Sequence, residues 1–240
     1  MKLRTSLILG CGEIGSAYYS IFSQKSQTYR LDLRPELSDK RIPKIEVLHV
    51  CLRHSENFQD TVTAAVKKYR PAVINNMSTV PPGTTEKLGN NAVHSTTRGL
   101  HPNLKDSILA AKKHIGGPKA LELAEYFAHF GIQTVTHAKA KTTELAHILS
   151  NTLYGVQIMY ADEMDKLCRQ YGVDYFEAVQ LYSMTHNEAY SALGLQSKYR
   201  PILSPPGGRI GGHCVTQGAA LIPENIRGPL LSRLATFNKS

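Results

Sequence analysis

Three glycines near the start of the chain have the spacing of a phosphate-binding turn. An apolar run over residues 7–9 ends at Gly10, and Gly12 and Gly15 complete the pattern G-x-G-x-x-G just before a helical pattern begins. Gly10 permits a tight turn, Gly12 lets a pyrophosphate approach the backbone, and Gly15 lets helix and strand pack closely. The N–H groups at the start of the helix attract phosphate. We therefore predict a dinucleotide site that includes Gly10, Cys11, Gly12, Glu13, Ile14 and Gly15.

The acidic residue that such a site requires is Asp32. It lies 17 residues beyond Gly15, where a second strand is expected to end. A carboxylate there accepts hydrogen bonds from the adenosine ribose hydroxyls and disfavours a 2′-phosphate, which predicts NAD as the cofactor. Arg34 follows two residues later and could instead bind a 2′-phosphate, so NADP is the less favoured alternative. The ends of later strands add Leu52, Ser78 and Thr79 to the predicted cofactor site.

Composition narrows the class of protein. The 240 residues are 42% hydrophobic and 20% charged, as in ordinary folded proteins. The net charge is +9, but the basic residues are dispersed, which favours steering of anionic small molecules over binding of nucleic acid. No apolar run reaches the ~20 residues that span a membrane. The four cysteines are scattered, which predicts no metal site and no disulfide framework, and a cytoplasmic location.

The elements that must position these residues alternate along the first part of the chain. Strand-like runs at residues 45–52, 72–77 and 134–136 alternate with helical patterns at residues 57–69 and 118–130. This alternation predicts an α/β fold, a Rossmann-type doubly wound parallel sheet, over residues 1–138. Ligands bind such sheets at the carboxyl ends of the strands. The turn Ser78-Thr79-Val80-Pro81-Pro82-Gly83 follows one such end, and we expect the hydroxyls of Ser78 and Thr79 to face the ligand.

The second part, residues 139–240, is predicted to be an all-helical domain. Thr142 and Thr143 are expected to cap a long central helix that continues to about Tyr171, with an apolar stripe wide enough to bury against a second subunit. We therefore expect a homodimer. Residues 201–214 are rich in proline and glycine and end in a cysteine; such a loop can wrap a ligand with its backbone N–H groups. Its predicted substrate-binding residues are Gly208, Arg209, Gly211, Gly212 and His213.

These pieces, in this order, resemble the nucleotide-sugar 6-dehydrogenases, the family of the UDP-glucose, GDP-mannose and UDP-N-acetylmannosamine dehydrogenases. Four blocks carry the resemblance, and they are Gly10-x-Gly12-x-x-Gly15 with Asp32, Ser78-Thr79-Val80-Pro81-Pro82-Gly83-Thr84, Glu144-Leu145-Ala146-His147-x-x-x-Asn151, and Gly208-x-x-Gly211-Gly212-His213-Cys214. The match covers the first two domains of that family, so the chain is expected to be a shortened form without the third, nucleotide-sugar-binding domain.

The resemblance implies NAD-dependent oxidation of a primary alcohol in two steps, by way of an aldehyde that a cysteine traps. It assigns the nucleophile to Cys214, the positioning of a water to Thr79, and polarisation of the oxyanion to Asn151. Its catalytic lysine, four residues before the asparagine, is replaced by His147, which shares a helical face with Asn151 at the i, i+4 spacing. The family's aspartate after the cysteine is Gly218, and its glutamate is Asn103, which we expect to contact substrate.

These replacements leave several hypotheses open. The chain could oxidise a sugar derivative, a small polyol or a hydroxy compound beside Cys214, by one hydride transfer or two. It could also be a degenerate NAD-binding protein without chemistry of its own. His101-Pro102 is similar to a motif of the prephenate and arogenate dehydrogenases, but that family does not explain the Gly-Gly-His-Cys segment.

Overall fold

The computed structural model describes residues 5–99, 103–210 and 213–239; of His213 and Cys214 it describes the backbone and not the side chains. The chain forms two compact units, Met1–His147 and Ile148–Ser240. They divide inside helix α5 (Ala140–Tyr171), whereas the boundary expected from the sequence, at residues 138 and 139, falls just before this helix.

The first unit is built on a seven-stranded sheet in the order β2-β1-β3-β4-β5-β6-β7. Every neighbouring pair is parallel except β5 and β6. The strands are β1 (Ser6–Leu9), β2 (Thr28–Leu31), β3 (Val47–Val50), β4 (Val73–Asn76), β5 (Ala92–Ser95), β6 (Lys113–Gly116) and β7 (Thr134–His137). The order reverses between β1 and β3, and the crevice beyond their carboxyl ends is where a doubly wound sheet binds its ligand. The predicted fold class is confirmed.

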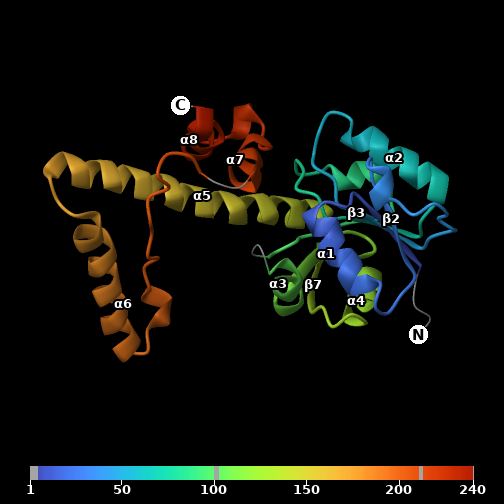
Figure 1. Cartoon of the computed structure of the whole chain (residues 1–240), viewed down its shortest axis with the longest axis horizontal. Coiled ribbons are helices and arrows are strands. Elements are labelled where there is room, and N and C mark those ends of the chain that lie inside the picture. The colour runs from blue at the N-terminus through green and yellow to red at the C-terminus, as the bar shows by residue number, and fades with distance from the viewer. Residues whose placement is uncertain (1–4, 100–102, 211–212, 240) are drawn as a thin grey trace. The chain divides into compact units, whose positions relative to one another are not determined.

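Both faces of this sheet are covered, because its strands are apolar on both sides. Ile8 and Val47 pack with α1 (Glu13–Phe22), α3 (Leu104–Ala110) and α4 (Ala120–Ala128). Leu7 and Leu48 pack with α2 (Phe58–Tyr69) on the opposite face (Figure 1). Alternate residues of one strand therefore bury against different helices, as expected for a parallel sheet.

Two strands and one helix of the first unit were not predicted. β5 and β6 carry buried polar residues, among them His94 and Lys113, and therefore do not show the apolar pattern of an interior strand. They also form the one antiparallel pair. α3 was likewise missed. The long helix begins at Ala140, so Thr142 and Thr143 lie inside its first turn and not at its cap.

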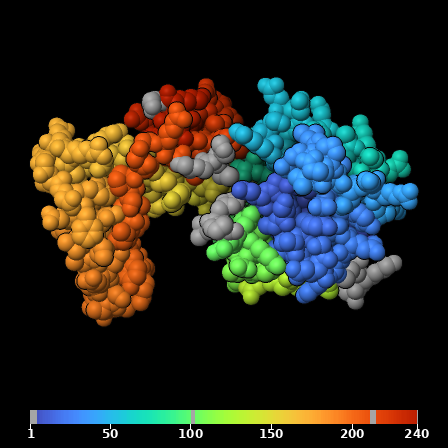
Figure 2. Space-filling view, viewed as in Figure 1, coloured from blue at the N-terminus to red at the C-terminus, as the bar shows by residue number. Residues whose placement is uncertain are grey.

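The second unit is helical, as predicted. It contains most of α5, a π-helical stretch (Phe176–Leu181) that leads into α6 (Tyr182–Ala192), and the helices α7 (His213–Ala220) and α8 (Pro229–Thr236). Its small core joins Met159 of α5 to Ile210, Val215, Ala219 and Leu234. The end of α5 and α6 form the gold and orange surface in Figure 2. Within the described residues, every helix is too short or too polar to cross a membrane.

Candidate functional site

The turn after β1 has the geometry that its three glycines predict. Gly10 has φ +93°, and a Cβ atom there would lie 2.7 Å from the carbonyl oxygen of Cys51. A Cβ atom on Gly15 would lie 1.9 Å from the carbonyl oxygen of Gly10. A Cβ atom on Gly12 would meet nothing within 4 Å, so this position is open to a ligand. The first turn of α1 leaves backbone N–H groups without intrahelical acceptors, and these suit a diphosphate.

Asp32 is bound to this turn. Its Oδ2 accepts a hydrogen bond of 2.6 Å from the backbone N–H of Cys11, and its Oδ1 accepts one of 3.0 Å from Nε of Arg34. The hydrogen bond from Arg34 is the main cause that lowers the pKa of Asp32 to about 2, so the carboxylate is charged at neutral pH. The Arg34 side chain is 54% exposed and also donates to the carbonyl oxygen of Cys11. Asp32, the predicted acceptor for the ribose, and Arg34, the alternative partner of a 2′-phosphate, therefore form one ion pair.

The loops after β3 and β4 are joined by the hydroxyl of Ser78. This hydroxyl accepts a hydrogen bond from the backbone N–H of Leu52 and donates one to the carbonyl oxygen of Val50. Ser78 is buried, and its hydroxyl is already hydrogen-bonded within the fold. Thr79 is half-buried. The contacts of Leu52, Ser78 and Thr79 with a cofactor stay predictions.

A buried carboxylate, to which we had assigned no role, fastens this region to α5. Glu144 is 1% exposed and accepts hydrogen bonds from the backbone N–H groups of Gly83, at 2.5 Å, and Thr85, at 2.8 Å. It therefore caps the short helix Thr85–Leu88 and holds the turn that contains Thr79 against the first turns of α5. The sequence alone does not reveal this role of Glu144, because the loop that it binds is about 60 residues away in the chain.

A buried histidine, His94, and a half-buried one, His147, lie beside each other at the start of α5. The ring centroids of His94 and His147 are 6.2 Å apart. His94 is held by the hydroxyl of Thr143 and the carbonyl oxygen of Ser78, whereas Nδ1 of His147 is buried without a hydrogen-bond partner among the described residues. Burial, and to a smaller extent nearby positive charges, lowers the pKa of His94 to about 3 and that of His147 to about 4. Both rings are neutral at pH 7.

A buried lysine of the first unit, Lys113, was not singled out from the sequence. Lys113 is 4% exposed, and its Nζ donates hydrogen bonds of 2.6 Å to the hydroxyl of Tyr18 and to the carbonyl oxygen of Thr96. Burial lowers the pKa of Lys113 to about 7. Nothing in the pattern around Lys113 distinguished it from a surface lysine, because its strand was itself not recognised.

The remaining predicted residues are distributed over both units. Asn103 is exposed and precedes α3. Asn151 is half-buried on α5, four residues beyond His147. Gly208 and Arg209 are exposed in the second unit. Gly211 and Gly212 lie outside the described residues, as do the side chains of His213 and Cys214; the backbone of Cys214 is in the first turn of α7 and not in a loop.

The meeting of the residues of the second unit with the dinucleotide turn stays a prediction. Within the described part of the chain, no cluster of three or more histidine, cysteine or acidic residues has the arrangement of a metal site.

Comparisons with known proteins point to one family. Residues 141–228 match the model of the UDP-glucose/GDP-mannose dehydrogenase family, central domain. A UDP-N-acetyl-D-mannosamine dehydrogenase of Pyrococcus horikoshii is 29% identical over 182 residues, which cover 69% of this chain and 40% of that protein. A protein of the same name from Methanocaldococcus jannaschii is 28% identical over 169 residues, covering 66% and 36%. The matched part thus spans about two fifths of the length of these relatives.

The fold agrees with solved structures as well. The structure of the UDP-D-ManNAc dehydrogenase from Pyrococcus horikoshii superposes with a TM-score of 0.80 at 22% identity, over 98% of this chain and 68% of that one. This likeness supports the architecture of a Rossmann-type sheet followed by helices.

Proposed function

We propose that the chain is an NAD-dependent oxidoreductase of the UDP-glucose/GDP-mannose dehydrogenase family, whose central-domain model residues 141–228 match. The substrate is a CH–OH group of a sugar derivative, in the manner of UDP-glucose 6-dehydrogenase, and the reaction takes place beside Cys214. The observation that carries the proposal is the turn from Gly10 to Gly15, which is open to a ligand at Gly12 and closed by protein at Gly10 and Gly15.

The residues of the turn fit a dinucleotide. The N–H groups at the start of α1 would hold the diphosphate, and Asp32 would accept hydrogen bonds from the ribose hydroxyls. The charged state of Asp32 favours NAD over NADP, because a 2′-phosphate would meet a fixed negative charge. When bound, NAD supplies the acceptor for the hydride that leaves the substrate carbon.

The chemistry assigned to the chain itself begins at Cys214. Its place in the first turn of α7 puts it near the positive end of a helix dipole, which favours the thiolate. In a first oxidation the substrate alcohol loses a proton and a hydride and becomes an aldehyde. In a second, the thiolate adds to the aldehyde carbon; loss of another hydride then gives a thioester, and water releases the acid and the thiol.

His147 limits how this chemistry can proceed. A neutral imidazole with a pKa of about 4 is a weak base, and it supplies no fixed positive charge for an oxyanion. Asn103 and Gly218 also replace acidic residues of the family. Fewer side chains are therefore left to assist hydrolysis of the thioester. We therefore expect the first, two-electron step to be faster than the second, with Thr79 and Asn151 assisting.

NADH absorbance tests the proposal directly. The protein is incubated with NAD and, in turn, UDP-N-acetylmannosamine, UDP-glucose, GDP-mannose, free sugars and hydroxy acids. Turnover with one of them is expected to be lost in Cys214→Ala, while NAD affinity changes by less than about threefold, because the thiol is not part of the diphosphate turn. Cys168→Ala, in a buried residue of α5, is the matched control for loss of a thiol. Full activity of Cys214→Ala would refute the mechanism.

A second candidate is an NAD-binding protein without catalysis, and the neutral state of His147 favours it. This candidate predicts tight NAD binding and no NADH formation with any of these compounds. The alternative of a prephenate-dehydrogenase-like hydroxy-acid dehydrogenase rests on His101, which lies outside the described residues; turnover of prephenate alone would support it.

We also propose that the protein is a homodimer. Exposed apolar side chains are frequent on α5 in the second unit, where Leu153, Tyr160 and Leu167 are each more than half exposed. A surface of this kind is usually covered by another protein surface. Light scattering after size exclusion is expected to give twice the mass of the chain, and Leu153→Glu with Tyr160→Glu to give the monomer. Monomeric wild-type protein at micromolar concentration would contradict the proposal.

A further inference from the structure

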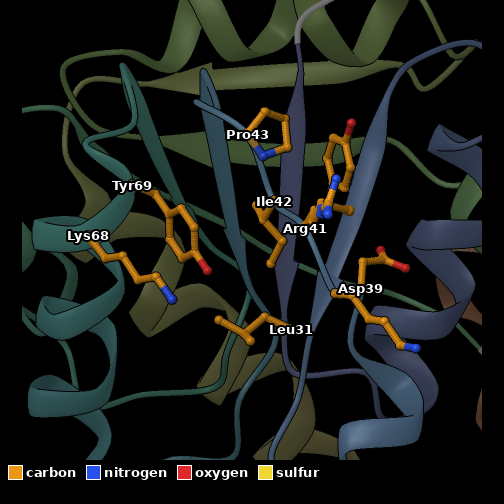
Figure 3. A pocket seen from close by; sticks show the side chains of 9 residues that line it. Leu31, Asp39, Arg41, Ile42, Pro43, Lys68 and Tyr69 are labelled. Carbon is orange, nitrogen blue, oxygen red and sulfur yellow. The ribbon is translucent and has the colours of Figure 1, made fainter.

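In addition to the crevice predicted for NAD, the first unit has a hollow between α2 and the segment that connects β2 to β3. It has a volume of about 590 Å³, within the range of small-molecule sites. Figure 3 shows Lys68 and Tyr69 projecting from α2 on one side, with Arg41, Ile42 and Pro43 on the other and Leu31 between them. The hollow exists because this connection is an irregular segment with one short helical turn (Pro35–Leu37), so no long helix covers the sheet beside β2.

The lining of the hollow combines apolar walls with uncompensated positive charge. Leu31, Ile42 and Pro43 are joined by the rings of Tyr29 and Tyr69. The charged residues are Lys40, Arg41, Lys68 and a single carboxylate, Asp39. That carboxylate is already paired with Arg30, at 3.4 Å, whereas none of the three cations has an ion-pair partner within the described residues. The Lys68 ammonium lies 5.1 Å from the ring centre of Tyr69.

This hollow is separate from the dinucleotide turn. Its α2 residues, Lys68 and Tyr69, stand at the end of a 12-residue helix, which is about 18 Å long. The crevice predicted for NAD lies at the carboxyl ends of β1 and β3, and α2, which connects two parallel strands, starts at that edge and ends at the opposite one. The hollow thus extends from the far edge of the sheet, where Lys68 and Tyr69 lie, along β2 to Leu31, the residue before Asp32, and it borders the crevice predicted for NAD.

From this lining we propose that the hollow binds a nucleoside phosphate. The half-buried ring of Tyr29, beside the apolar side chains of Leu31 and Ile42, suits a base or a ribose, because bases stack on aromatic rings. Cations on both sides of the opening attract the phosphate, and Arg41 can hold two of its oxygens at once. The ligand class is accordingly an aromatic ring joined to at least one phosphate, and not a free sugar or a bare anion.

Calorimetric titration with UMP and with AMP, in the presence of saturating NAD, tests the proposal on the full chain. One nucleotide per chain is expected to bind, at least tenfold more tightly than uridine or inorganic phosphate, and more weakly as salt rises from 50 to 300 mM because the attraction is screened. No binding beyond that of NAD would overturn the proposal. Inorganic phosphate that binds as tightly as UMP would also overturn it, because the rings would then contribute nothing.

Charge-reversal variants locate the site. Arg41→Glu with Lys68→Glu is expected to weaken nucleotide binding at least tenfold. Lys44→Glu with Lys67→Glu changes the net charge equally at exposed neighbours that do not line the hollow, and is expected to change the affinity by less than twofold. Equal weakening by both pairs would refute the site. Melting temperature and NAD affinity, measured on each variant, separate this outcome from misfolding and from any failure of the proposed dehydrogenase activity.

Discussion

The two units differ in how much of their apolar surface each one buries within itself. The sheet of the first unit is covered on both faces, and one cluster of polar groups inside it is paired: His49 contacts Tyr126 and Asn75, and Asn75 accepts a hydrogen bond from Ser95. All of these groups are buried. The described part of the second unit has a small core and exposes large apolar side chains such as Tyr171 and Tyr182, at 77% and 70%.

This difference suggests that the first unit holds the cofactor and the second unit associates with another protein surface. A unit of the first kind can hold a cofactor site rigidly, because the strands that lead into the turn are packed against helices on both faces. A unit that exposes apolar surface depends on another surface to complete it. We therefore expect the first unit to respond to changes in its interior, and the second to changes in packing and association.

The largest expected effect is acid destabilisation of the first unit. His49 and His94 are fully buried, and burial lowers the pKa of each to about 3. Between pH 6.5 and 3 these rings bind protons only in the unfolded chain, so their contribution to stability is lost as pH falls below about 6.5. From pH 7 to 5 the loss is about 2 kcal/mol for each histidine. Urea unfolding at pH 7, 6 and 5 measures it.

The control for this effect is His94→Asn, which removes one buried titrating group near the start of α5. Its free energy of unfolding is expected to be lower at pH 7 and to fall less steeply with acid. A free energy of unfolding that is constant between pH 7 and 5 in the wild-type protein would show that these rings are not held in a neutral interior.

Gly15→Ala is expected to have the next largest effect, about 3 kcal/mol of destabilisation, because the added Cβ would lie 1.9 Å from the carbonyl oxygen of Gly10. Gly12→Ala is the matched control in the same turn, and its Cβ meets no protein atom within 4 Å. That variant is expected to retain the stability of the wild-type protein and lose NAD affinity at least tenfold. Equal melting temperatures for the two variants would contradict the packing role of Gly15.

Sequence analysis correctly predicted the features that depend on a local or regularly repeated pattern of residues. The apolar run before Gly10, the glycine spacing and Asp32 are local features, and the structure has the strand, the turn and the hydrogen bond from Cys11 to Asp32 that join them. The long helix was also predicted, because its apolar stripe persists over many turns.

It failed where a polar residue is buried by partners distant in the chain. β5 contains His94 and Ser95, and β6 contains Lys113; their burial is compensated by Thr143, Asn75 and Tyr18. A single sequence does not show such pairings, so these strands resembled loops. The start of α7 was missed for another reason, because Gly218 and two β-branched residues, Val215 and Thr216, give this helix a weak intrinsic preference.

Gly155→Ala applies the packing test to the second unit, with an expected cost of about 2 kcal/mol. A Cβ atom there would lie 2.4 Å from Cγ1 of Val215 and 2.8 Å from the Leu234 side chain, so α7 and α8 would have to move away from α5. Gly218→Ala, where a Cβ atom meets nothing within 4 Å, is expected to stabilise α7 by about 0.5–1 kcal/mol. Thermal melts followed by circular dichroism distinguish the two, and destabilisation by both would mean that α7 packs differently.

The smallest expected effect concerns Arg34, the one exposed cation of the dinucleotide site that pairs with Asp32. Removing its side chain takes away one of the two hydrogen bonds that Oδ1 of Asp32 accepts from this residue, since the backbone N–H remains, and removes the group that could hold a 2′-phosphate. Arg34→Ala is therefore expected to change NAD affinity by less than threefold and to weaken NADP about tenfold, or about 1.4 kcal/mol. Arg53→Ala, in another exposed residue near the strand ends, controls for the loss of one charge. Fluorescence titration with both cofactors measures the ratio. A ratio that moves toward NADP in Arg34→Ala would contradict this prediction, because it would show that the arginine does not hold the 2′-phosphate.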